Sequence, residues 1–212
     1  MRLILSALFV LGLVVATQAE AHAQAESQPH ADAPGFYAFE GLTYSKLHGE
    51  ITARAPAALQ VQFGVGYQPQ NSLWAYELMG RGGGTLDEGG DEAALLGWGV
   101  RAKRFVPLAR HFNLYGRVGV TENFMSSWQG SDLAGFGLEY GAGAMASMRV
   151  RALGLLFWPA FFMDFGPKVT LSLWADLGGE VGNLHAGHES SSESYDYRST
   201  SAGYGLTIGG HF

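Results

Sequence analysis

The carboxyl-terminal segment Tyr204–Phe212, YGLTIGGHF, decides the fold. In an extended strand, successive side chains point to opposite sides. One side of this segment is apolar and carries Tyr204, Leu206, Ile208 and Phe212. The other side is small or polar and carries Gly203, Gly205, Thr207, Gly209 and His211. This alternation predicts a strand whose two faces meet different surroundings.

The amino-terminal segment has the composition of a secretory signal peptide. Arg2 precedes an apolar run over residues 3–15, and the small-residue site Ala21-His22-Ala23 follows. The run is shorter than the roughly 20 residues that a membrane-spanning helix needs. We expect cleavage after Ala23, with Ala19 or Ala21 as alternatives. A linker over 24–34 and a single domain over 35–212 then form the mature chain.

Composition excludes several classes of protein. The chain has 31 Gly, 13% aromatic and only 15% charged residues, which disfavours intrinsic disorder. The net charge of −6 disfavours nucleic acid as a partner. There is no Cys, so an exported fold must be stable without disulfides. A barrel closed by its own hydrogen bonds meets that condition.

Alternation of apolar and small or polar residues recurs along almost the whole mature chain. It is clearest where Leu59, Val61 and Phe63 alternate with Gln60 and Gln62. Strands are predicted at about 36–47, 59–67, 72–82, 93–105, 111–121, 134–147, 168–181 and 199–212. The predicted fold is all-β, an antiparallel up-and-down transmembrane β-barrel of eight strands. Ten strands remain an alternative if the apolar segment 148–167 adds a hairpin. Otherwise that segment lies in the membrane interface or extends its neighbouring strands.

The predicted connections alternate in character. Tight turns are expected at residues 69–71 and 107–110, and longer polar or Gly-rich loops at 48–56, 83–92, 122–133 and 182–198. Short periplasmic turns and long outer loops are typical of outer-membrane barrels.

The chain resembles small bacterial outer-membrane β-barrel proteins of the OmpA/OmpX type. The signal peptide, the string GFGLEYGAGA at 135–144 and the terminal YGLTIGGHF carry this resemblance. It implies a bacterial outer-membrane location, contact with outer-membrane lipid and lipopolysaccharide, and a monomer. It also implies that the insertion machinery recognises the closing strand through Tyr204, Leu206, Ile208 and Phe212. Position 210 lacks the aromatic residue common in the family, and segment 148–167 is unusually long.

Charged residues on the non-apolar faces are expected to meet in the lumen as one network. They are Glu40, Glu77, Arg81, Arg101, Lys103, Arg117, Glu139, Asp176 and Glu180. They could form a polar passage or a paired network that fills the barrel. Eight strands enclose room for little more than their own side chains, and buried charges must be paired. The near balance of signs therefore favours a filled lumen, and the small size disfavours a general diffusion porin.

Three classes of function are consistent with such a barrel. We favour a structural or surface-interaction protein, followed by a narrow channel or carrier of small or apolar molecules. A lipid-modifying enzyme ranks last, because His188 and Ser190, the only close His/Ser pair, lie in a Ser/Glu-rich loop. We expect no cofactor and no metal. His185, His188 and Glu189 are weak candidate ligands without a fourth partner.

Overall fold

The computed structural model describes residues 35–49, 56–69, 72–86, 93–109, 111–126, 132–151, 168–186 and 194–210. These residues form eight strands, in accordance with their alternating sequence. The strands are β1 (Phe36–Gly49), β2 (Ala57–Tyr67), β3 (Trp74–Thr85), β4 (Ala94–Ala109), β5 (Phe112–Ser126), β6 (Leu133–Arg151), β7 (Lys168–Ala186) and β8 (Ser194–Gly210). No helix in this part of the chain is long and apolar enough to span a membrane.

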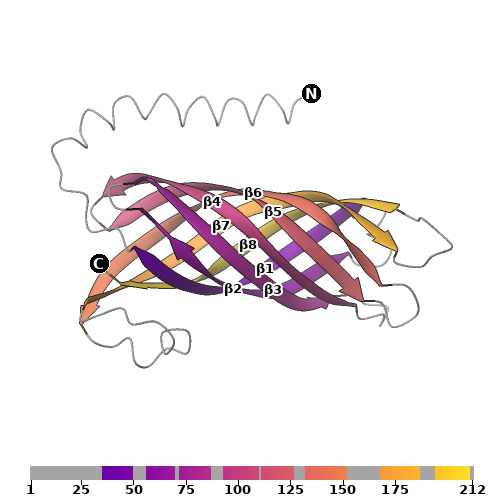
Figure 1. Ribbon diagram of the computed structural model, residues 1–212, viewed down its shortest axis with the longest axis horizontal. Helices are drawn as coiled ribbons and strands as arrows, with labels where there is room; N and C mark the ends of the chain where they lie inside the picture. The colour runs from indigo at the N-terminus through magenta and orange to yellow at the C-terminus, as the bar shows by residue number, and fades with distance from the viewer. Residues whose placement is uncertain are drawn as a thin grey trace.

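The strands form a closed antiparallel barrel in which each one pairs with its neighbours in sequence. β8 pairs with β1 from Tyr37↔Gly209 to Gly49↔Tyr197, so no strand edge remains open. Figure 1 shows the strands tilted across the long axis of the barrel. β6 pairs directly with β7, which excludes the ten-stranded alternative and confirms the prediction of eight.

Several strands extend beyond their predicted bounds. β5 continues to Ser126, β7 continues to Ala186, and β8 already begins at Ser194. The predicted long links 122–133 and 182–198 are therefore wrong in extent, because hydrogen-bonded pairing continues past the apolar part of each strand. Pro107, predicted in a turn, lies within β4, where the register shifts between Pro107 and Ala109. A register irregularity at a strand end accommodates a residue without a backbone N–H.

The register fixes the width of the barrel. A path through directly paired residues, taken once around the barrel from β1, returns to β1 ten residues further on, at position 49 instead of 39. It passes through Phe39, Gly64, Met79, Gly99, Thr121, Gly137, Gly182, Tyr197 and Gly49. Eight strands with this stagger are tilted by about 40° and have a backbone radius of about 8 Å, given a rise of ~3.3 Å and a spacing of ~4.8 Å.

The two faces of the barrel differ as the alternation predicts. The outward face carries large apolar side chains, among them Phe63, Trp98 and Leu177, which are 52–69% exposed. The inward face carries buried polar, charged and aromatic side chains. A soluble protein rarely exposes so continuous an apolar surface, whereas a membrane-spanning barrel requires one.

Apolar side chains form a layer near each end of the interior. The terminal-end layer lies where β1 begins and β8 ends, and consists of Tyr37, Phe39, Ala75, Met79, Phe105, Tyr115, Met145 and Trp174. The loop-end layer lies at the opposite end, and consists of Leu47, Ala93, Met125, Leu133, Leu184 and Tyr197. Polar and charged side chains occupy the interior between the two layers.

Glycines make room for the large rings of the terminal-end layer. A Cβ at Gly66 would lie 2.2 Å from the ring of Tyr37, and one at Gly64 would lie 2.6 Å from the ring of Phe39. A Cβ at Gly205 would lie 2.6 Å from the ring of Trp174. The inward glycines of the sequence therefore serve a packing role, because an aromatic ring from a nearby strand covers each of these positions.

Gly66→Ala is expected to destabilise the barrel, because the added methyl group overlaps the Tyr37 ring and overpacking costs about 1–3 kcal/mol. Gly116→Ala is the matched control, since its Cβ would meet nothing closer than the Gly141 carbonyl oxygen at 4.0 Å. The measurement is the temperature at which the fast-migrating folded band disappears in gels of unheated and heated samples. Equal melting of both variants would contradict this packing role.

Candidate functional site

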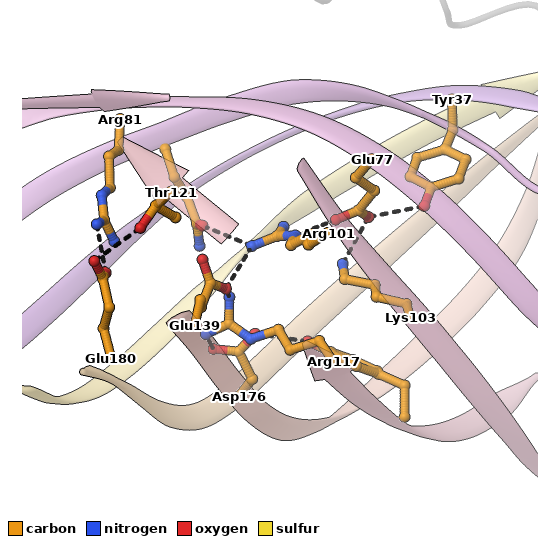
Figure 2. A network of polar contacts seen from close by, with 12 residues as sticks. Tyr37, Glu77, Arg81, Arg101, Lys103, Arg117, Thr121, Glu139, Asp176 and Glu180 are labelled. Carbon is orange, nitrogen blue, oxygen red and sulfur yellow. Dashed lines mark hydrogen bonds and ion pairs between the residues drawn. The ribbon is translucent and has the colours of Figure 1, made fainter. Parts of the chain in front are cut away.

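The lumen charge network is the candidate functional site. Its eight members are Glu77, Arg81, Arg101, Lys103, Arg117, Glu139, Asp176 and Glu180. Five of the eight strands, β3 to β7, supply them, because each residue occupies an inward position of its strand. Figure 2 shows them as two neighbouring groups of polar contacts in the interior, one around Arg81 and Glu180 and the other running from Glu77 to Asp176.

Glu77 connects the network to the terminal-end layer. Its carboxylate forms ion pairs with the Arg101 guanidinium and with the Lys103 ammonium, the latter at 2.8 Å. It also accepts a hydrogen bond of 2.8 Å from the Tyr37 hydroxyl. The side chain of Glu77 is fully buried, so two cations and a hydroxyl replace the water that an exposed carboxylate would bind.

Aromatic rings surround Lys103, one of the most deeply buried side chains of the protein. Its Nζ lies 4.9 Å from the ring centroid of Tyr115, 5.5 Å from that of Phe39 and 5.8 Å from that of Trp174. Cations are attracted to the faces of such rings, most strongly where water is excluded. The terminal-end layer therefore contacts the cation directly, and apolar packing and charge pairing depend on each other here.

The centre of the network is a chain of alternating charges. Arg101 contacts Glu139 at 3.3 Å, Glu139 also pairs with Arg117, and Arg117 contacts Asp176 at 3.3 Å. The Tyr115 hydroxyl donates a 2.9 Å hydrogen bond to Asp176. Each acid in this row of alternating charges lies next to a base, so none of these four charges is isolated.

A second group of contacts lies nearer the loop end. Glu180 pairs with Arg81 and accepts hydrogen bonds from Thr121 at 2.8 Å and from Asn123 at 2.5 Å. The Tyr197 hydroxyl also donates to Glu180. Because Tyr197 belongs to the loop-end layer, this second group contacts that layer, as the Glu77 group contacts the terminal-end layer.

A small polar cavity lies beside the network. It measures about 20 Å³ for the centres of water-sized molecules, enough for roughly one water. Gln62, Arg81, Arg117 and Glu139 line it, together with hydroxyl side chains of β1 and β8. Within the described part of the chain, Gln62 Nε2, Arg81 Nε, Arg117 Nε and Glu139 Oε2 make no hydrogen bond. A water molecule, both donor and acceptor, suits these atoms better than an ion of either sign.

The structure brings together eight of the nine charged residues predicted for the lumen. The prediction for Glu40 is wrong, because Glu40 is exposed on the outward face and pairs across the strands with Phe63 and Leu206. The weak alternation of residues 36–47 gave no clear assignment of faces. Without Glu40, the described lumen holds four acids and four bases.

Sequence reasoning missed three uncharged members of the network, Tyr37, Asn123 and Tyr197. Asn123 and Tyr197 fell in segments predicted as loops, and Tyr37 in the strand with the least regular pattern. They could have been found only by counting in steps of two from a residue whose face was assigned correctly. Asn123, for example, lies two residues after Thr121 and so faces the same way.

The other predicted sites are partly described. Tyr204 and Leu206 lie on the outward face of β8. Ile208 has the same parity but is buried, at 6% exposed, and Phe212 is outside the described residues. His185 is exposed at the end of β7, and His188, Ser190 and Glu189 are outside the described residues, as are the signal peptide and the linker. Among described residues, no three His, Cys, Asp or Glu side chains are grouped to bind a metal ion.

Comparisons with known structures agree with this architecture. The chain is similar to Neisserial surface protein A, with 15% identity, a TM-score of 0.54, and 82% of this chain and 97% of that chain covered. It also matches the attachment invasion locus protein Ail of Yersinia pestis, with 14% identity, a TM-score of 0.45, and 83% and 99% covered. No protein-family model and no curated protein matches the sequence. The chain therefore has the fold of small eight-stranded outer-membrane barrels.

Glu77→Gln is expected to destabilise the barrel by roughly 3–5 kcal/mol, because it leaves Lys103 and Arg101 without their shared carboxylate. The measurement is the free energy of unfolding in urea, with the protein in lipid vesicles. Glu122→Gln, an outward substitution on β5, is the control with little expected effect.

Adding Lys103→Met to Glu77→Gln removes one unpaired cation and should recover part of the lost stability. If the double variant were as unstable as the sum of its single substitutions, Glu77 and Lys103 would not be coupled.

Proposed function

We propose that the protein is a bacterial outer-membrane barrel with a structural or surface-interaction role, whose lumen is closed to solutes. The single observation that carries the closed lumen is the balanced network of four acids and four bases between two apolar layers. A backbone radius of about 8 Å leaves room for side chains or one small ligand. Here the described interior side chains occupy that room, and the cavity beside the network holds about one water.

The chemistry of the lumen supports this role over transport. A conducting pore needs a continuous polar path, and the aromatic rings of the terminal-end layer interrupt it. A carrier of apolar molecules needs an apolar cavity, whereas the cavity beside the network is polar. We also propose that the protein is not an enzyme, because the buried carboxylates of the described lumen are paired with cations.

The proposed location rests on the outward face and on the closed hydrogen-bond ladder. An apolar outer surface and paired backbone groups are what a lipid environment demands of a β-structure. In this setting the links at the loop end meet the exterior, and the insertion machinery, outer-membrane lipid and lipopolysaccharide are the partners.

The purified protein is expected to give no ion conductance above that of a bare planar bilayer, because both apolar layers and the network block the lumen. A large porin serves as the positive control, and heat-modifiable migration of recovered protein checks that the barrel is folded. A steady, large conductance would contradict the closed lumen and favour the channel alternative.

Replacement of the terminal aromatic residue tests the proposed location and insertion route. Phe212→Ser should lower the amount of heat-modifiable barrel in the outer-membrane fraction several-fold, while His211→Ser should have a smaller effect. The amount is measured on gels of fractionated cells. Wild-type protein in the soluble periplasmic fraction would contradict the membrane location.

A further inference from the structure

Glu40 differs from the four acids of the lumen charge network. It is exposed on the outward face of β1, and its carboxylate makes no hydrogen bond or ion pair within the described part of the chain. Its cross-strand neighbours are Phe63 and Leu206. Phe63 is 57% exposed and the nearby Tyr204 is 63% exposed, so an apolar surface surrounds the carboxyl group.

Glu40 lies well inside the apolar band. It is four residues above Phe36, where the chain enters the barrel, which places it roughly 10 Å from that end at a strand tilt of about 40°. Aromatic side chains mark that end, as Phe36 and Tyr67 stack there with centroids 4.8 Å apart. The apolar band of such barrels is about 25 Å tall, so neither interface lies close to Glu40.

An ionisable group at this depth, facing lipid, lacks the partner that a polar group needs away from water. The described outward cations lie nearer the two ends. Lys46 is six residues further along β1, roughly 15 Å higher. Arg104 lies over the ring of Trp74 at 5.3 Å, at the terminal end.

We propose that Glu40 marks the interface of a homodimer, in which the Glu40 carboxyl groups of two copies hydrogen-bond to each other. A two-fold axis along the membrane normal places equivalent residues at equal depth, so Glu40 of one copy meets Glu40 of the other. The two groups satisfy each other when at least one carries a proton, which it donates to the other. The exposed apolar side chains near Glu40, such as Phe63 on β2 and Tyr204 on β8, supply the surrounding contact, whereas Ala38 and Ile208 are already buried.

A head-to-tail contact is less suited to this side chain. It would have to bring Glu40 against Arg104 of another copy, on β4, which is three strands away from β1 around the eight-stranded barrel. Two contact faces set so far apart generate open chains or large rings, whereas the two-fold contact closes with two copies. The proposed homodimer differs from the monomer that the resemblance implies.

Cysteine cross-linking in native membranes tests the interface, because the chain has no cysteine of its own. Glu40→Cys should form a disulfide-linked dimer on oxidation. Leu78→Cys on β3 and Val118→Cys on β5, which are outward and at similar depth, should not. Equal cross-linking at all three positions, no dimer from Glu40→Cys, or a cross-link to a different protein would overturn the proposal.

Association of the full chain in detergent or vesicles gives a second measurement. Glu40→Gln retains a side chain that can pair with its own copy, and should dimerise within a few-fold of wild type. Glu40→Leu should weaken dimerisation by roughly 3- to 30-fold, the range for one buried polar contact in a membrane. Unchanged or tighter association of Glu40→Leu would overturn the carboxyl pair.

The inference rests on the proposed membrane location, and the two fail in different ways. Heat-modifiable migration of the same samples reports barrel formation and insertion independently of dimerisation. A folded, membrane-inserted protein that stays monomeric overturns the dimer alone, whereas a soluble protein overturns the membrane location first.

Discussion

Closure of the hydrogen-bond ladder between β8 and β1 is the constraint on which the other features depend. In lipid, backbone groups have no water to pair with, so a sheet must close on itself. Closure with eight strands and a ten-residue stagger sets a radius of about 8 Å. That radius in turn decides the interior, because side chains from opposite walls must meet and every charge among them needs a partner.

The interior meets this demand by combining two kinds of contact. Lys103 pairs with Glu77 and also lies among the rings of Phe39, Tyr115 and Trp174. The rings in turn fit against neighbouring strands because glycines face them. Apolar packing, ion pairing and the glycine positions therefore depend on one another, and a change in one alters the contacts of the others. Such coupling favours a rigid, filled lumen over a passage that opens easily.

The sequence predicted the barrel well, because alternation reports which face of a strand meets lipid. The alternation alone assigns Leu59, Val61 and Phe63 to the outward face, and their neighbours Gln60 and Gln62 lie inward as expected. Strand ends were less predictable, since polar residues such as Asn123 and Tyr197 continue the ladder where the apolar pattern stops. Pairing needs only backbone groups, so hydropathy alone does not mark where it ends. For the same reason Asn123 and Tyr197 were not found as members of the network.

Glu40 shows how strongly the position of a single residue matters in such a fold. One step along β1 separates it from Phe39, whose ring lies inside the barrel against Arg101. Moved to the inward face, a fifth acid would unbalance four acids and four bases in a space with little room for water. On the outward face the same carboxylate leaves the lumen neutral and meets lipid instead. The Glu40 carboxyl group then needs its partner at the surface between two barrels and not in the interior of one. Two-fold symmetry supplies an identical group there at the same depth.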